Sequence, residues 1–296
     1  MKQTIVLLIS GIILSSGIIR HDVPETDYTK LANEKQFDCV GRMVKLADSS
    51  ALGSCVLIAG KYVLTAAHCM IDSDTRPDTL KYQNETIIVF TPINFYKREC
   101  ETFGVMFNNK LYKVKRYTIH PSYKEHALPY DIALIELETA VNDIAIPGMN
   151  TGYDELNDTI TGVGYGVSGI ANNPESVAPF SKKIAGQNII DKIGIYKDSA
   201  TGLQGMLMAD FDHPEKGKKC NQLGKPAALH LEYTVGGGDS GSGAFRKKGN
   251  TWELVGICSG ADVNIKLIMK YGYYGTVMQW TRLSLYHQWI KDQIKS

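Results

Sequence analysis

Three segments of the chain carry side chains that together could perform acyl transfer. His68 follows an apolar run, Asp131 stands at the head of another, and Ser240 lies at the apex of the glycine-rich stretch 236–243. A serine hydroxyl is a weak nucleophile until a base takes its proton, which a histidine does near neutral pH. A buried carboxylate fixes the histidine tautomer and stabilises the imidazolium. These residue types therefore indicate catalysis by an activated serine.

The glycines around Ser240 suggest a second role for that turn. Glycine adopts tight backbone conformations that other residues would find strained. Such a turn can aim two backbone N–H groups, from Gly238 and Ser240, at a developing negative charge. We therefore predict an oxyanion hole formed by these two amides.

The elements that must position these residues are short strands. Strand-like runs recur at residues 54–58, 62–64, 87–90, 111–117, 132–137, 160–163, 228–233, 243–245, 254–258 and 273–278. Turn-rich stretches such as 72–78 and 171–179 lie between them, and this density favours an all-β barrel or sandwich over βαβ units. Only the C-terminus is typical of a helix, with Ser284 as its cap and Trp289 on its apolar face.

Charge and composition exclude two classes of protein. The 296 residues include 32 Lys and Arg against 31 Asp and Glu, for a net charge of +1. A general nucleic-acid binder usually carries a clear basic excess, so we expect no nucleic-acid partner. The hydrophobic fraction of 44% is that of an ordinary globular chain, so long disordered tails are not expected.

Residues 1–17 are typical of a secretory signal peptide. Lys2 precedes an apolar region that ends in Ser15, Ser16 and Gly17. The alternative is a membrane anchor, but the apolar stretch is shorter than the roughly 20 residues that a spanning helix needs. We therefore expect a secreted protein, extracellular or periplasmic, that has no membrane partner after signal cleavage. Secretion also makes disulfides permissible.

Taken together and in this order, the motifs are far more specific than each alone. They read Leu-Thr-Ala-Ala-His-Cys at 64–69, Asp-Ile-Ala-Leu at 131–134 and Gly-Asp-Ser-Gly at 238–241, with weaker matches at 161–166, 255–260 and 281–290. The sequence resembles the chymotrypsin/trypsin family of serine endopeptidases over nearly all of residues 18–296. The resemblance implies an all-β fold of two six-stranded antiparallel β-barrels with a C-terminal helix.

The same resemblance implies domain bounds and residue roles. The first barrel would span about 35–147, the second about 155–283 and the helix about 284–295, with the active site in the cleft between the barrels. Ser240 would be the nucleophile, His68 the general base and then acid, and Asp131 the orienting carboxylate. The spacings between these residues are longer than in compact family members. Inserted surface loops near 72–110 and 165–225 would absorb the difference at little cost in stability.

Asp239 gains a role from the family pattern. In active members, the Asp before the nucleophile pairs with a buried, newly cut N-terminal amine. Ile18 and Ile19 resemble that apolar N-terminus, so we predict an ion pair between Ile18 and Asp239, created by signal cleavage itself. Two alternatives are activation by a trypsin-like cut after Arg20 or Lys30, and a segment 18–35 that is only a surface lead-in.

The six cysteines are partly assigned by the resemblance. Cys55 and Cys69 match the family disulfide that ties the histidine loop to a neighbouring strand. Three pairings are open to the remaining four cysteines; among them we favour Cys39–Cys100 and Cys220–Cys258. The family's usual cysteine shortly before the nucleophile is absent, because Gly236 stands there.

Specificity is predicted mainly by what the substrate pocket lacks. Thr234 stands where trypsin-like members place the Asp that attracts basic side chains, so no preference for Arg or Lys is expected. Ser259, Gly260 and Ala261 should form the pocket wall, where backbone groups pair with an extended substrate. Met278 or its neighbours would shorten the pocket and favour small or medium apolar side chains. Acid specificity, as in staphylococcal glutamyl endopeptidases, is an alternative, but Cys258 replaces their pocket histidine.

The predicted function is that of a secreted serine endopeptidase that uses no cofactor and no metal. Asp72, Asp74 and Asp78 lack the spacing of an EF-hand and are interpreted as a solvated turn. The expected partners are protein or peptide substrates, with protein protease inhibitors as a second class. The alternative is a catalytically inactive homologue that binds or regulates. An esterase is disfavoured because Ser242 stands where the lipase elbow requires glycine.

Overall fold

The computed structural model describes residues 5–7, 17–82, 85–124, 128–178, 182–262 and 264–295. Within them lie the helices α1 (Glu25–Ala32), α2 (Gly217–Cys220), α3 (Ile265–Tyr271) and α4 (His287–Lys295), with short 3-10 turns at Lys35–Phe37, Ala67–Met70, Cys100–Thr102 and Leu283–Leu285. All other regular structure in these ranges is β-strand. This is the all-β architecture that the sequence predicts.

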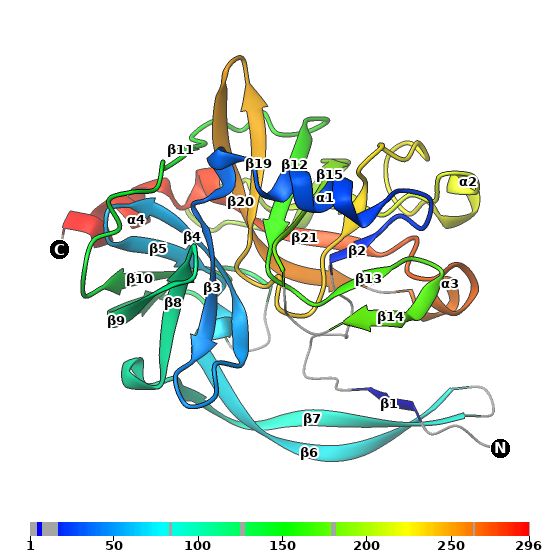
Figure 1. Cartoon of the computed structure of the whole chain (residues 1–296), viewed down its shortest axis with the longest axis horizontal. Helices are drawn as coiled ribbons and strands as arrows, with labels where there is room; N and C mark the ends of the chain where they lie inside the picture. The colour runs from blue at the N-terminus through cyan, green and yellow to red at the C-terminus, as the bar shows by residue number, and fades with distance from the viewer. Residues whose placement is uncertain are drawn as a thin grey trace.

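The first half of the chain forms a closed six-stranded barrel, on the left in Figure 1. Its strands are β3 (Val40–Lys45), β4 (Ala51–Ala59), β5 (Tyr62–Thr65), β8 (Phe103–Phe107), β9 (Lys110–Ile119) and β10 (Ala133–Leu137). In β9 the side chains of Tyr112 and Val114 are buried while Lys113 and Lys115 are exposed. This alternation is what a strand with one face toward a barrel core requires.

The second half forms an eight-stranded sheet that curls on itself (Figure 1). It contains β11 (Gly148–Met149), β12 (Thr159–Gly164), β15 (Ile184–Ile189), β16 (Lys192–Lys197), β17 (Gln204–Asp210), β19 (Gly243–Lys248), β20 (Thr251–Asp262) and β21 (Val277–Arg282). The end of β15 meets β17, because the backbone N–H of Asp191 donates to the carbonyl of Met208 over 3.0 Å. The predicted pair of barrels is therefore present, and β11 and β16 are additional to the six strands expected of the second.

A small sheet holds the N-terminal segment against the second barrel. Strand β2 (Gly17–Ile19) lies between β13 (Ser168–Ile170) and β18 (Tyr233–Thr234), and β14 (Asn173–Ala178) completes the order β14-β13-β2-β18. Ile18 and Ile19 are buried, at 0% and 2% exposure. This segment is thus part of the core and not a surface lead-in.

Two stretches predicted as turns are strands. Residues 72–78 belong to β6 (Ile71–Tyr82), which pairs with β7 (Glu85–Lys97) in a long hairpin that extends from the first barrel in Figure 1. Residues 171–179 include β14. The polar residues that suggested turns are tolerated because these strands lie largely outside the two cores, so periodicity toward a core is weak there.

The C-terminal helix begins later than predicted. α4 starts at His287, and the buried hydroxyl of Ser284 donates to Glu155 Oε1 over 3.0 Å instead of capping the helix. Ile290 of α4 is fully buried in the core of the first barrel. The C-terminal helix therefore packs on the barrel that is formed by the first half of the chain.

The predicted signal peptide falls largely outside the described residues. Of positions 1–17, the structure describes Gly17 and the short strand β1 (Ile5–Leu7), which pairs with β7. None of the helices in the described ranges has the length and apolar character needed to cross a membrane.

Candidate active site

His68 and Asp131 are joined by two contacts at the end of the first barrel. His68 lies in the 3-10 turn that follows β5, and Asp131 stands two residues before β10. Oδ1 of Asp131 accepts the backbone N–H of His68 over 2.9 Å, and Oδ2 lies 2.8 Å from His68 Nδ1. An ionised carboxylate only accepts hydrogen bonds, so Nδ1 carries the proton and the neutral ring keeps its lone pair on Nε2.

The environment of His68 favours its charged form. Burial by itself lowers the pKa of His68, but the carboxylate of Asp131 outweighs it, so that the pKa lies well above its ordinary value. The side chain of His68 is 24% exposed and that of Asp131 only 4%. The imidazole is thus accessible from one side while its partner is enclosed.

Two hydroxyl groups from the second barrel complete the surroundings of Asp131. The hydroxyl of Ser259 in β20 donates to Oδ2 of Asp131, and Thr281 Oγ1 in β21 donates to its backbone carbonyl over 3.0 Å. Ser259 is predicted as part of the substrate-binding wall through its backbone, which stays a prediction, and its hydroxyl also contacts the acid. Gly260 and Ala261, which follow it, are partly exposed at the end of β20.

Ser240 lies on the turn between β18 and β19, against strand β4 of the first barrel. Its carbonyl accepts the backbone N–H of Ser54 over 2.8 Å. A Cβ on Gly53 would lie 3.0 Å from this carbonyl and also 3.0 Å from the Sγ of Cys69, the neighbour of His68. The turn that carries Ser240 is therefore adjacent to the segment that carries His68.

No hydrogen bond joins Ser240 to His68 among the described residues, and His68 Nε2 is buried without a partner. Catalytic hydrogen bonds are often long in a free enzyme and shorten when substrate is bound. The amides of Gly238 and Ser240 donate to no carbonyl or side chain in the described part of the chain. Gly238 has a φ of +90°, a conformation that favours glycine.

Asp239 is held by two backbone amides and is adjacent to the N-terminal strand. Its carboxylate accepts the N–H groups of Gly166 and Gly236, each over 2.9 Å. Burial raises the pKa of Asp239 to about 6, against the lowering effect of these amides. A Cβ on Gly17 would lie 3.7 Å from Oδ2 of Asp239. Gly17, the residue that precedes Ile18, is therefore close to this carboxylate.

Thr234, predicted at the pocket floor, is fully buried in β18, where it pairs with Ile18 of β2. Met278 is also fully buried and pairs with Ala261 across β20 and β21. The residues expected to form the pocket thus come from three strands of the second half of the chain, β18, β20 and β21.

All six cysteines are free thiols in this structure. The predicted Cys55–Cys69 bridge is therefore not formed here, and it remains a prediction. A Cβ on Gly53 of β4, two residues before Cys55, would lie 3.0 Å from the Sγ of Cys69. Cys220 lies in α2 and Cys258 in β20, and neither is bonded.

No group of three or more His, Cys, Asp or Glu side chains in the described residues is arranged to hold a metal ion. The three aspartates weighed for calcium all lie in β6, where Asp72 forms an ion pair with Arg98 over 2.9 Å.

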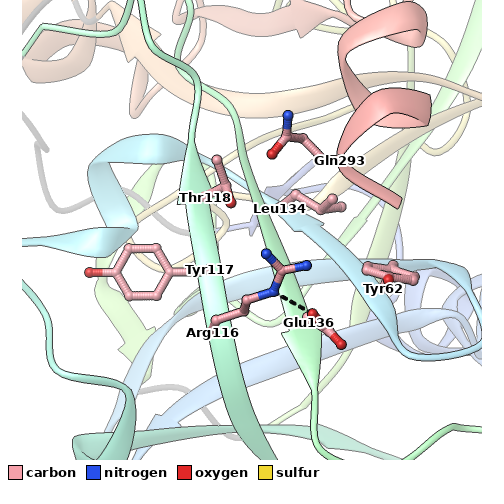
Figure 2. Close-up of a pocket in the computed structure, with 7 residues that line it drawn as sticks. All are labelled: Tyr62, Arg116, Tyr117, Thr118, Leu134, Glu136 and Gln293. Atoms are coloured by element: carbon pink, nitrogen blue, oxygen red, sulfur yellow. Dashed lines mark hydrogen bonds and ion pairs between the residues drawn. The ribbon is translucent and has the colours of Figure 1, made fainter. Parts of the chain in front are cut away.

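A shallow pocket lies away from this site. Figure 2 shows the Arg116 guanidinium directed at Glu136, which also binds Lys61 over 2.6 Å and Lys115 over 3.0 Å. These basic groups lower the pKa of Glu136 to about 2. None of the predicted site residues lines this pocket, which holds an ion-pair cluster on the outside of the first barrel.

Sequence reasoning missed Ser54 and Thr281, which fix Ser240 and Asp131 from the opposite barrel. Ser54 stands in no motif, and a lone buried hydroxyl carries no pattern in one sequence. The Thr-Arg-Leu-Ser run that contains Thr281 is a weak signal, because it matched the family without suggesting a role.

Comparison with known proteins gives two findings. A model of the trypsin family matches residues 32–222. The chain is also similar to human "Transmembrane protease serine 11A", with 25% identity over 247 residues, which cover 80% of this chain and 48% of that protein. The chain thus spans about half the length of this curated relative. The family match ends before Ser240, so the assignment of this residue depends on its motif and its position.

Proposed function

This chain belongs to the trypsin family, and we propose that it is a serine endopeptidase in which Ser240, His68 and Asp131 form the catalytic triad. The observation that carries the proposal is the pair of contacts between His68 and Asp131, beside the glycine-rich turn of Ser240. An enclosed carboxylate that fixes the proton on Nδ1 leaves the basic Nε2 on the far side of the ring, without a partner, which is the arrangement that activates a serine.

The chemistry is acyl transfer in two steps. Ser240 Oγ attacks the peptide carbonyl while His68 Nε2 takes its proton, and the carbonyl oxygen becomes an anion beside the amides of Gly238 and Ser240. The anion collapses, the C–N bond breaks, and His68 returns the proton to the leaving amine. Water then attacks the ester with His68 again as base, and the acid product leaves with Ser240 restored.

Asp131 acts by stabilising the imidazolium that forms in each step. The raised pKa of His68 and the hydroxyl of Ser259 on Asp131 both support this role. In the proposed site, two groups of the second barrel thus keep the acid oriented toward the base.

Activation in this proposal depends on a free amine at Ile18. The burial of Ile18 and the position of Gly17 beside Asp239 support it, since an amine created there would meet a carboxylate that has no basic side chain as partner in the described structure. Signal cleavage after Gly17 would supply that amine and would also place the enzyme outside the cytoplasm.

The proposed substrates are proteins or peptides, without a preference for basic side chains, because Thr234 stands at the predicted pocket floor and is buried. Protein protease inhibitors are proposed as the second class of partner. The proposed site needs no cofactor or metal, since the base, acid and anion donors are all residues of the chain.

The test is covalent labelling with a fluorophosphonate, read by intact mass. The chain that starts at Ile18 should gain one adduct, which peptide mapping should place on Ser240. Ser240→Ala and His68→Ala should both abolish the adduct, whereas Ser199→Ala, a change at an exposed hydroxyl, should retain it. A folded chain with that N-terminus and no adduct would contradict the proposal and favour an inactive homologue.

A further inference from the structure

Ser54 makes three hydrogen bonds to the second barrel from a fully buried position in β4. Its backbone N–H donates to the carbonyl of Ser240 over 2.8 Å. Its hydroxyl donates to the carbonyl of Gly238 over 2.9 Å and accepts the backbone N–H of Tyr165, also over 2.9 Å. One side chain of the first barrel thus binds two separate segments of the second.

The carbonyl of Gly238 belongs to the residue whose N–H is directed at the proposed anion. A carbonyl and an amide on either side of one Cα are linked by φ and ψ, so fixing the carbonyl restricts the direction of the amide. The turn is also closed by the Asp239 N–H, which donates to the carbonyl of Gly236 over 2.9 Å. The Ser54 hydroxyl is the contact that reaches this turn from the other barrel.

The hydrogen bond that the Ser54 hydroxyl accepts from Tyr165 also restrains the segment that binds Asp239. Tyr165 precedes Gly166, whose N–H binds the carboxylate of Asp239 over 2.9 Å. The Ser54 hydroxyl therefore connects the segment 165–166, which holds Asp239, with the turn that carries the anion donors. The hydroxyl thus acts as a donor to one segment and as an acceptor from the other.

We propose that Ser54 is a positioning residue that orients the Gly238 amide toward the anion formed in the reaction. This inference rests on the proposed peptidase function. Donors that are already oriented need no rearrangement when charge develops, so the effect belongs to the transition state and not to substrate binding.

The test is Ser54→Ala in the chain that starts at Ile18. Loss of one hydrogen bond that orients a donor is expected to lower kcat about tenfold, while KM for a peptide ester changes by less than about twofold. Binding of a peptide aldehyde, whose adduct with Ser240 places an oxyanion at the same amides, should weaken by the same factor as kcat/KM. Binding of the matching peptide acid product should not change.

A matched variant separates positioning from general loss of packing. Thr276→Val removes another buried hydroxyl, one that donates to the Tyr273 carbonyl over 2.7 Å and does not contact the Ser240 turn. It should lower thermal stability as much as Ser54→Ala does, yet keep kcat and aldehyde affinity. Ser54→Thr keeps a hydroxyl and should recover most of kcat if it folds.

The outcomes are distinct. A wild-type chain that neither turns over peptides nor reacts with fluorophosphonate overturns the proposed function and this inference with it. An active wild type with a folded Ser54→Ala variant of unchanged kcat overturns the inference alone. Equal weakening of the aldehyde and of the peptide acid also overturns it, because a general distortion of the cleft would affect both.

Discussion

Gly17 packs beside the carboxylate of Asp239, since a Cβ on this glycine would lie 3.7 Å from Oδ2. The strand that continues from it is buried between β13 and β18. The interior of the second barrel therefore already contains the segment whose new N-terminus would neutralise Asp239.

The first prediction concerns that N-terminus. A chain that starts at Ile18 should have a kcat/KM at least tenfold above that of a chain that retains a Met-Gly extension, because only the first places a free amine beside Asp239. Activity should be measured after the starting residue of each preparation has been verified by intact mass. Equal activities would contradict the proposed activation.

The pH dependence of these two chains should also differ. The pKa of Asp239 is raised to about 6 by burial, so in the extended chain this group is protonated as the pH falls through 6. A neighbouring amine favours the charged carboxylate and lowers this pKa. The chain that starts at Ile18 should therefore keep its structure around Ser240 to lower pH.

The second prediction concerns Asp131→Asn. The carboxylate raises the pKa of His68, and only the neutral histidine is a base, so kcat/KM of the wild type should rise with pH through that raised value. The variant loses the charge and the tautomer control, which should lower kcat by about 10⁴-fold and move the acidic limb to lower pH. A pH–rate profile with an unmoved acidic limb would contradict the assignment.

The third prediction concerns four acidic residues in the second half of the chain. None of Asp191, Asp210, Asp212 and Glu232 forms an ion pair with a basic side chain in the described residues. Burial raises the pKa of each, to about 6 for Asp191, about 7 for Asp212 and about 9 for Glu232, and raises that of Asp210 as well. The fold therefore favours their neutral forms.

A carboxyl whose folded pKa is raised contributes stability at low pH that is lost as the pH rises toward the folded value. For Asp212 this window runs from about 4 to about 7. The wild type should lose unfolding free energy between pH 5 and pH 8. The variant Asp212→Asn should lose about 1–2 kcal/mol less over the same range, allowing for partial exposure. Urea denaturation at both values measures this. The exposed change Asp143→Asn should leave the pH dependence as in the wild type.

The fourth prediction concerns a buried ion pair between the segment that joins β11 to β12 and the end of β21. Glu155 is fully buried and binds Arg282 over 2.6 Å, while Asn150 and Ser284 donate to its other oxygen. Glu155→Ala leaves a buried cation without a partner and should lower the unfolding free energy by about 3–5 kcal/mol.

The matched change at the surface is Glu253→Ala, which removes one of three acids around Arg246 and should cost far less. Chemical denaturation of both variants provides the comparison. Similar losses for the two would contradict the expectation that the buried Glu155 pair contributes more to stability than the more exposed Glu253 pair.

The fifth prediction concerns the cysteines. If Cys55 and Cys69 form the predicted bridge in the secreted protein, alkylation under denaturing, non-reducing conditions should leave these two unmodified. Peptide mapping of the alkylated chain identifies them. Alkylation at all six positions would agree with the free thiols of this structure and contradict the bridge.

The placement of His68 near Asp131 could be predicted because His68 lies in a motif that follows an apolar run and Asp131 in a motif that begins one. The same motifs, with the density of short strand-like runs, predicted the fold class. Of the hairpin at 71–97, only the strand-like run 87–90 could be predicted, because its two strands pair mainly with each other and not with a core, so periodicity is weak in the rest. The contact between the Ser259 hydroxyl and Asp131 could not be predicted, because sequence order places Ser259 at the predicted pocket wall but does not tell which way its hydroxyl points. Ser54 was missed for the same reason.

The hydroxyl groups that fix Asp131 and the backbone that fixes Ser240 belong, in each case, to the opposite barrel. Neither half of the chain therefore holds the complete proposed site, even though each forms its own main sheet. A small slide of one barrel past the other would separate these partners while leaving both sheets intact. The proposed activity therefore depends on how the two barrels pack against each other. A measurement of that activity would report this packing, and not only whether each half is folded.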